Sequence, residues 1–171
     1  MKLSRWRWDN VPVPEAHVAA LAAASLAQVV LPVRVPLGRR SARLVGWPTM
    51  VAGIGLAAWG AASASDAGVG VDRPARLVTT GAFAISRNPM YLGWSIAAAG
   101  AGIATRSAWV LAAAAIATAV AHREVLGEEA GLSSAFGREY ATYVDATPRY
   151  LGSNGPANAI ARVATMIRGT R

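Results

Sequence analysis

The chain contains no cysteine, and only two of its 171 residues are histidines. The lack of cysteine excludes disulfides, thiolate nucleophiles and cysteine-ligated metal sites. His17 and His122 are far apart in the sequence, so a metal site built on histidine has no support either. We therefore expect no metal in this protein.

Charged residues are also scarce. They make up 15% of the chain, whereas about a quarter is usual for a soluble domain. Hydrophobic residues make up 54%, and the mean hydropathy is +0.34. Apart from His17, no charged residue or histidine falls within residues 16–33, 44–65, 88–105 or 107–121. Apolar stretches of about 17 to 25 residues can cross a bilayer as helices. The sequence therefore predicts an all-α integral membrane protein with about four transmembrane helices.

The breaks between these stretches set the expected helix ends. We predict helices over residues 14–33, 45–64, 90–105 and 108–126. Arg106 and Ser107 form a tight turn, so the last two helices make an antiparallel hairpin. The third helix carries small residues that allow close contact with a neighbouring helix; they are Gly93, Ala97, Gly100 and Gly102.

A further helix is expected beyond the last apolar stretch. Leu132, Phe136, Tyr140 and Tyr143 recur at helical spacing, which predicts an amphipathic cytoplasmic C-terminal helix ending at Pro148. The basic tail over residues 158–171 is either a helix lying on the membrane surface or a frayed end.

The net charge of +8 is carried mainly by arginine. The arginines flank apolar stretches and form no stripe interleaved with aromatics, so membrane lipids rather than nucleic acid are the expected partner. The positive-inside rule places the N-terminus, the loop over residues 65–89 and the C-terminal region in the cytoplasm, at the cell membrane. Five arginines fall on the opposite side, against the rule: Arg34, Arg39, Arg40, Arg43 and Arg106.

Phenylalanine and tyrosine are absent before Phe83, and all six lie between Phe83 and Tyr150. They flank two polar stretches, residues 77–93 and 128–149, which we expect to meet on one side of the membrane. Aromatic rings offer flat apolar faces and, in tyrosine, a polar tip. The concentration fits either a pocket for a planar or lipid-like ligand or an interfacial belt of aromatics.

Three acids follow the last apolar stretch. Glu124 and Glu128 are four residues apart and share a helix face, with Glu129 adjacent. Like charges at that spacing repel, so a cation beside them would relieve the cost. Arg123, Arg87 or the ammonium or sulfonium of a ligand could supply it. The alternative is a solvated helix face.

The polar loop ends in Asn88 and Pro89, at the start of the third predicted helix. Asparagine can cap a helix and proline suits its first position, which explains these two residues by themselves. Gly81 and Gly93 would let the backbone approach a ligand, and free N–H groups at a helix start can bind a carboxylate.

Two strings in the chain resemble motifs of the isoprenylcysteine carboxyl methyltransferase and phospholipid methyltransferase families. The first is LVTTGAF at residues 77–83 with RNPMYLG at 87–93, where the families read roughly LVTxGxY and RHPxYxG. The second comprises EEAGL at 128–132, FGREYATY at 136–143 and PR at 148–149, where the families read EExxL, FGxxYxxY and PR. The N-terminal half resembles the families only in being transmembrane.

The resemblance implies a membrane-embedded methyltransferase that uses S-adenosylmethionine (SAM). It divides the chain into a transmembrane helix pair (1–66), a cofactor loop with hairpin and catalytic helix (67–150), and a basic tail (151–171). Glu128 would bind the ammonium group of the cofactor. Carried over by position, the cofactor-binding residues are Arg76, Leu77, Val78, Phe83, Asn88, Pro89, Met90, Tyr91, Glu128 and Glu129.

Three positions depart from the family pattern. Asn88 replaces a histidine but keeps a hydrogen-bonding side chain, and Phe83 lacks the usual tyrosine hydroxyl. Glu124 stands where relatives often carry a substrate-binding arginine, and Arg123 is one position away. This weakens the case for an anionic acceptor.

The expected reaction is an in-line displacement at the sulfonium methyl, driven mainly by positioning of the two reactants. The acceptor would be prenylated, isoprenoid or phospholipid-like and would enter from the bilayer. A carboxylate acceptor needs no base, whereas an amine or hydroxyl does, and Glu124 and His122 are the candidates. The alternatives are an NADPH-dependent enzyme like the sterol reductases and a non-catalytic membrane scaffold with a decayed pocket.

Overall fold

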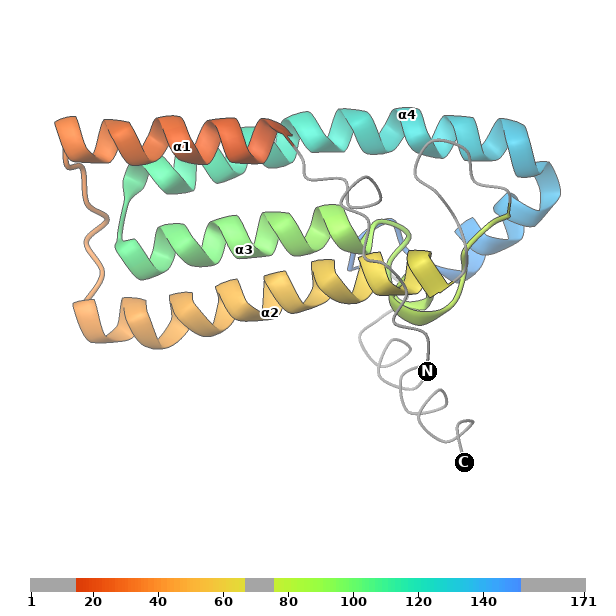
Figure 1. The fold of residues 1–171 in the computed structure, drawn as a ribbon, viewed down its shortest axis with the longest axis horizontal. Helices are drawn as coiled ribbons and strands as arrows, with labels where there is room; N and C mark the ends of the chain where they lie inside the picture. The colour runs from red at the N-terminus through yellow and green to blue at the C-terminus, as the bar shows by residue number, and fades with distance from the viewer. Residues whose placement is uncertain (1–14, 67–75, 152–171) are drawn as a thin grey trace.

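The computed structural model describes residues 15–66 and 76–151, and within them all regular secondary structure is helical (Figure 1). This confirms the predicted all-α class. The N-terminal segment, residues 67–75 and the basic tail lie outside the described residues. The elements in chain order are α1 (Glu15–Val30), α2 (Arg39–Asp66), the 3₁₀ helix η2 (Gly81–Ala84), α3 (Pro89–Thr105) and α4 (Ala108–Ala146).

Two of these helices, α2 and α4, are long and apolar enough to cross a membrane by length and composition. Helices α1 and α3 have 16 and 17 residues, so the number of four spans stays a prediction. Large apolar side chains lie exposed on the outer faces of the bundle, as lipid contact requires; they include Leu26, Val29, Val30, Leu44, Val51, Ile54 and Ile116.

Helices α2 and α3 run antiparallel and pack through small residues at close range (Figure 1). Gly46 lies against the backbone of Ala104, and Gly53 lies against that of Ala97. From the α3 side, a Cβ added to Gly93 would lie 2.7 Å from the carbonyl oxygen of Gly53. Only glycine permits such an approach. The predicted small-residue face is confirmed with α2 as its partner for Gly93, Ala97 and Gly100, whereas Gly102 lies against Leu111 of α4.

Helix α4 packs on α1 and on α3, which completes a four-helix arrangement. The turn between α3 and α4 is the predicted one: Arg106 takes the left-handed conformation with φ 57°, and the hydroxyl of Ser107 accepts a hydrogen bond from Val110 N. The connector between α1 and α2 runs beside this turn, since Val35 N donates to the carbonyl of Arg106 at 2.9 Å. These contacts define the end of the bundle opposite to the loop over residues 76–88.

The structure differs from the prediction at the start of α2 and in where the C-terminal helix begins. Helix α2 begins at Arg39 rather than near residue 45, because its first turns are held by the packing of Gly46 on α3. The predicted C-terminal helix is confirmed in part: the helical run of α4 breaks at Gly137, where φ is 48°, and a second helix follows this break and ends at Ala146. The break lies later in the chain than the prediction implied, since Leu132 and Phe136 still precede it. Glycine adopts this angle without strain, so the end of α4 turns back toward the loop (Figure 1).

Candidate functional site

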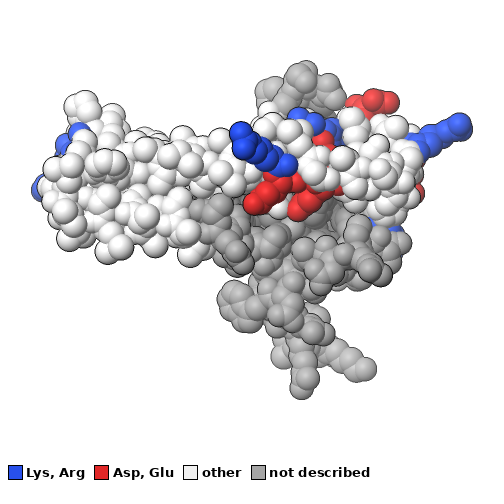
Figure 2. All heavy atoms as spheres, turned by 90° about the horizontal axis from the view of Figure 1, so that it is seen from above, with Lys and Arg blue, Asp and Glu red and all other residues white. Residues whose placement is uncertain are grey.

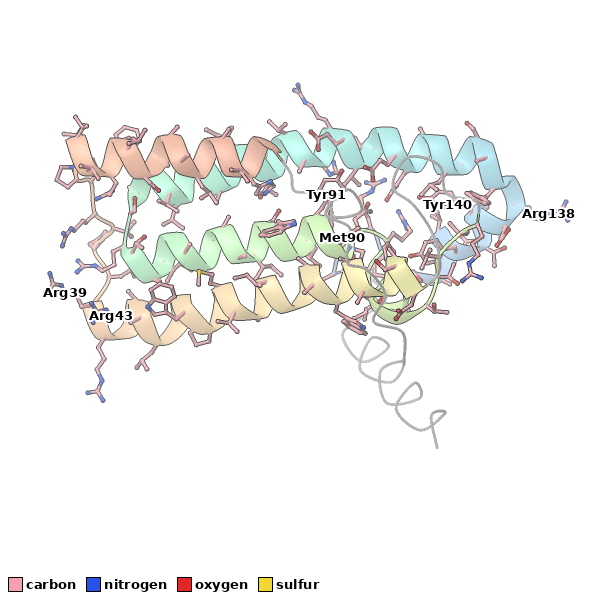
Figure 3. The ribbon with its side chains drawn as sticks, in the orientation of Figure 1. Arg39, Arg43, Met90, Tyr91, Arg138 and Tyr140 are labelled. Carbon is pink, nitrogen blue, oxygen red and sulfur yellow. The ribbon has the colours of Figure 1, made fainter. Side chains whose placement is uncertain are left out.

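Three segments that are distant in the sequence meet at one end of the bundle. They are the loop over residues 76–88, the polar part of α4 after Ala121, and the segment over residues 147–151 (Figures 1 and 3). The expectation that the two polar stretches lie together is confirmed by the hydrogen bonds between them.

Glu129 is the centre of this contact. It is 8% exposed, and both of its carboxylate oxygens accept hydrogen bonds from Arg87, with Nη2 at 3.2 Å from each. Arg149 approaches the same carboxylate, with Nη2 2.9 Å from Oε2, and Asn88 donates its amide N–H to Oε1 at 3.0 Å. The cation expected beside the acidic cluster is therefore Arg87, acting on Glu129 together with Arg149.

The same residues tie the loop to the end of α4. Arg87 donates from Nη1 to the carbonyl of Thr147 at 2.7 Å and from its backbone N–H to that of Pro148 at 2.9 Å. The Tyr143 hydroxyl donates to the carbonyl of Phe83 at 2.7 Å. Because α4 turns back at Gly137, these carbonyls and Tyr143 come within reach of the loop.

The charge environment of Glu129 fixes its ionisation. Burial alone would raise the pKa of this carboxyl. The hydrogen bonds from Arg149 and Arg87 and the charge of Arg87 outweigh burial and hold the pKa below its ordinary value. Glu129 is therefore a carboxylate at neutral pH, and its negative charge neutralises the buried guanidinium of Arg87.

Acidification should weaken the fold at this point. The Glu129 ion pairs contribute fully above the pKa of the unfolded carboxyl, about 4.3, and are lost as the pH falls through the lower folded-state pKa. We expect the unfolding temperature in detergent to fall between about pH 5 and pH 3, and to fall less in Glu129→Gln. Partial desolvation of the Glu128 carboxyl, opposed by the hydrogen bond from Tyr91, raises its pKa, so its protonation acts in the opposite direction. Equal declines in both proteins would contradict the assignment.

Asn88 does not cap α3 with its side chain, although it occupies the capping position and Pro89 follows as the first helical residue. Its Nδ2 instead donates hydrogen bonds to Glu129 and, at 3.3 Å, to the carbonyl oxygen of Arg149. The sequence allowed a capping hydrogen bond from the Asn88 side chain, and the structure does not contain it. The two hydrogen bonds from Nδ2 fix the orientation of the amide group, and its oxygen makes no capping hydrogen bond to the start of α3.

Glu128, the neighbour of Glu129, lies on the exposed side of α4. Among the described residues its only hydrogen-bond partner is Tyr91, whose hydroxyl donates to Oε1 at 2.7 Å. Tyr91 itself is 8% exposed and packs with Ala121 and Val125. Glu128 therefore has one oxygen positioned by the protein and one available for a further donor.

The remaining residues of the predicted cofactor site are distributed around this point. Pro89 and Met90 face α2, where they lie against Gly60, and Figure 3 shows Met90 on the α2 side and Tyr91 toward α4. Arg76 is exposed, whereas Leu77, Val78 and Phe83 are half-buried along the loop.

A hollow of about 470 Å³ lies between the loop and the part of α4 that follows Gly137. This volume is within the range of small-molecule sites. Its lining includes none of the predicted cofactor residues but includes two of their immediate neighbours in the loop; the lining residues are Thr79, Ala84, Glu139, Thr142, Tyr143, Ala146 and Thr147.

The predicted catalytic candidates lie one to two turns before Glu128 on α4. Arg123 and Glu124 are exposed, and His122 is half-buried, with Nδ1 2.9 Å from the Tyr150 hydroxyl. Sequence analysis missed His17 of α1, which is 3% exposed and has no hydrogen-bond partner on either ring nitrogen. Glu124 acts on it electrostatically. No sequence signal links residues so far apart.

Sequence analysis also gave Arg149 no role beyond a motif match. Its guanidinium and carbonyl both take part in the contacts around Glu129, and the carbonyl accepts from Ser86 Oγ at 3.0 Å. The motif fragments RNP, EE and PR are therefore one structural unit, because Arg87, Asn88 and Arg149 all donate hydrogen bonds to the carboxylate of Glu129.

Comparison with protein-family models gives a match to the model described as phospholipid methyltransferase. The match covers residues 42–139, more than half of the chain. The chain belongs to the phospholipid methyltransferase family. Family membership and the two long apolar helices together indicate a membrane methyltransferase. No curated protein matches the chain.

The matched region of this phospholipid methyltransferase family member extends further toward the N-terminus than the motif resemblance did. It begins at Ala42 in α2 and so includes the helix that packs on α3. The likeness is therefore not confined to the two polar stretches. Tyr140, Tyr143 and Arg149 lie beyond its C-terminal limit.

Proposed function

We propose that the protein is a SAM-dependent methyltransferase whose acceptor is a lipophilic molecule entering from the bilayer, with the site facing the cytoplasm at the cell membrane. One observation carries the proposal: the three motif fragments are joined around Glu129, and the neighbouring Glu128 is left facing outward with a free oxygen. Family membership supports methyl transfer as the reaction.

The chemistry of the donor set fits the cofactor. SAM carries an ammonium and a sulfonium, and a carboxylate with a single hydrogen-bond partner among the described residues suits a cation. In this proposal Glu128 binds the ammonium, and Tyr91 holds Glu128 in place through its hydroxyl. Bound SAM supplies the activated methyl group.

Other residues of the predicted set would shape the site. Leu77, Val78 and Phe83 would form an apolar border beside the cofactor, with Arg76 at its edge. Asn88 and Glu129, which are bonded to each other, would act by fixing the loop rather than by touching the cofactor. Pro89 and Met90 would set the position of the loop through their contact with α2.

The acceptor side of the site would lie toward Glu124. The structure gives Glu124 no hydrogen-bond partner among the residues it describes, so this carboxylate is free to take a proton from an amine or hydroxyl acceptor. His122 is held by Tyr150 and is the weaker candidate base. Arg123 would serve an anionic acceptor, which needs no base.

Cofactor binding tests the proposal directly. We expect purified protein in detergent to bind SAM and S-adenosylhomocysteine, and Glu128→Gln to bind both about 10- to 100-fold more weakly, as loss of one charge-assisted hydrogen bond predicts. Isothermal titration measures both. Asp66→Asn changes an exposed acid at the end of α2 that does not line the hollow; it is the matched control and should keep wild-type affinity.

Two results would overturn this assignment. Absence of binding to both ligands in the wild-type protein would reject SAM as the cofactor, and binding of NADPH in its place would favour a reductase. Equal affinity in wild type and Glu128→Gln would reject Glu128 as the ammonium ligand. Labelled methyl transfer into a total lipid extract identifies the acceptor.

A further inference from the structure

The end of the bundle opposite to the candidate site carries five arginines, here called the arginine end: Arg34, Arg39, Arg40, Arg43 and Arg106. Four of them are exposed, and Arg106 is half-buried. Figure 3 shows Arg39 and Arg43 at the start of α2, far from Tyr91 and Tyr140. These are the arginines that contradict the positive-inside rule.

No acidic residue compensates this charge. The sequence has no Asp or Glu between residues 16 and 65 or between 88 and 121, the stretches that build this end. In the described ranges 15–66 and 76–151, the ion pairs involve Glu129 with Arg87 and Arg149 and none of the five arginines. Arg106 Nε is buried without a hydrogen-bond partner.

The arrangement is unfavourable within the protein itself. Arg39, Arg40 and Arg43 occupy the first turns of α2, where the helix dipole disfavours cations, and no acid is present in the first turn. Arg39 and Arg43 are four residues apart and repel each other. An external anion would relieve both effects at once.

The arginine end is held in a fixed shape. Arg34 pairs with Ser107 in an isolated antiparallel bridge, and Ala108 N donates to the carbonyl of Val33 at 3.1 Å. The Ser107 hydroxyl donates to Gln28 Oε1 at 2.7 Å. The connector and the turn therefore hold each other in place, which fixes the backbone of Arg34 and Arg106. The backbone of Arg39, Arg40 and Arg43 is fixed by the first turns of α2.

Two tryptophans mark the membrane level beside the arginines. Trp47 lies one turn after Arg43 and is 48% exposed, and Trp109 lies at the start of α4 and is 36% exposed. Trp109 Nε1 donates to the carbonyl of Leu31 at 2.8 Å. Tryptophan favours the interface between hydrocarbon and head groups, so the arginines lie at the depth of the lipid phosphates. Figure 2 shows white, uncharged surface between the blue tip and the mixed charges of the other end.

We propose that the arginine end binds the phosphates of anionic phospholipids in the leaflet that lies opposite to the candidate site. Guanidinium groups bind phosphate oxygens in pairs, and membrane-surface arginines are attracted to anionic lipid. The protein is thereby anchored at both ends of its apolar zone. The inference does not depend on the proposed cofactor or acceptor.

Thermal unfolding in lipid nanodiscs tests this binding. We expect the unfolding temperature to be roughly 5 °C higher in discs with about a third phosphatidylglycerol than in pure phosphatidylcholine. The triple change Arg39→Gln, Arg40→Gln and Arg43→Gln should lose most of the rise. The corresponding triple change to lysine should keep part of it, because lysine keeps the positive charge but lacks the paired donors of the guanidinium. In wild type the rise should shrink at high salt.

A pair of single changes locates the effect. Arg43→Gln should reduce the rise, whereas Arg138→Gln, which removes an exposed arginine at the other end, should leave it unchanged. Equal losses in the two variants would overturn the proposal, because they would assign the effect to net charge. A rise produced in phosphatidylcholine discs by inorganic phosphate alone would overturn the choice of lipid. If the glutamine triple variant does not fold, the lysine variant, the salt series and the two single changes still decide.

Discussion

Replacement of Glu129 by alanine is expected to destabilise the protein by about 3 kcal/mol, which corresponds to a fall of roughly 10 °C in the unfolding temperature. The change leaves the buried Arg87 guanidinium without its carboxylate and removes the acceptor of Asn88. We take the lower end of the range for a broken buried ion pair, because the Arg149 side chain is 37% exposed and can turn to water.

The matched control is alanine at the next position. Glu128→Ala removes one hydrogen bond from an exposed side chain and should cost less than about 1 kcal/mol. Changes at the two neighbouring residues should thus have different effects. Changes at Glu129 should lower the stability of the protein, and changes at Glu128 should lower its affinity for the cofactor. Similar losses of stability in both variants, measured by thermal unfolding without ligand, would show that Glu129 is not the structural centre.

Alanine at Gly53 is expected to destabilise the protein by about 2 kcal/mol, although alanine favours helix formation. A Cβ at Gly53 would lie 2.6 Å from the carbonyl oxygen of Gly93 and 2.9 Å from the Cα of Ala97. Both atoms belong to the backbone of α3, so the two helices must separate. Because α3 carries Asn88 and Tyr91 at its start, cofactor affinity should fall as well.

Gly55, two residues further along α2, provides the control, since a Cβ there would meet nothing within 4 Å. Gly55→Ala should be neutral or stabilising by up to about 1 kcal/mol, as helix propensity predicts. Thermal unfolding of the two variants in the same detergent makes the comparison. Equal stability of Gly53→Ala and Gly55→Ala would contradict the close packing of α2 on α3.

The sequence predicted features that depend on local signals. The hairpin of α3 and α4 followed from an uncharged stretch on each side of Arg106 and Ser107, and its turn is confirmed. The end of α4 was predicted less well. The helical spacing from Leu132 to Tyr143 predicted a further helix, and a helix does follow the break at Gly137. The pattern gives no sign that the residues before Gly137 still belong to the long helix that starts at Ala108.

The partner of the small-residue face on α3 was also beyond sequence reasoning. The small residues Gly93, Ala97 and Gly100 predict close contact with another helix, and either α2 or α4 could have been that helix. The structure gives the contact to α2, where Gly46 and Gly53 lie opposite. The small-residue faces of two helices must align along their axes before they can pack. The spacing of small residues within one helix does not reveal which partner helix aligns with it.

By itself the sequence determined that this is a helical membrane protein of the methyltransferase type and that its polar stretches belong together. Apolar length, turn residues and motif spacing are readable along the chain. Only the tertiary structure decided which acid faces which way. Neighbouring helical residues differ in direction by about 100°, so Glu129 turns inward to Arg87 while Glu128 stays outside. The inward direction of the Glu129 side chain depends on its hydrogen-bond donors Arg87, Asn88 and Arg149. Only the packing of segments that are distant in the sequence brings these donors together.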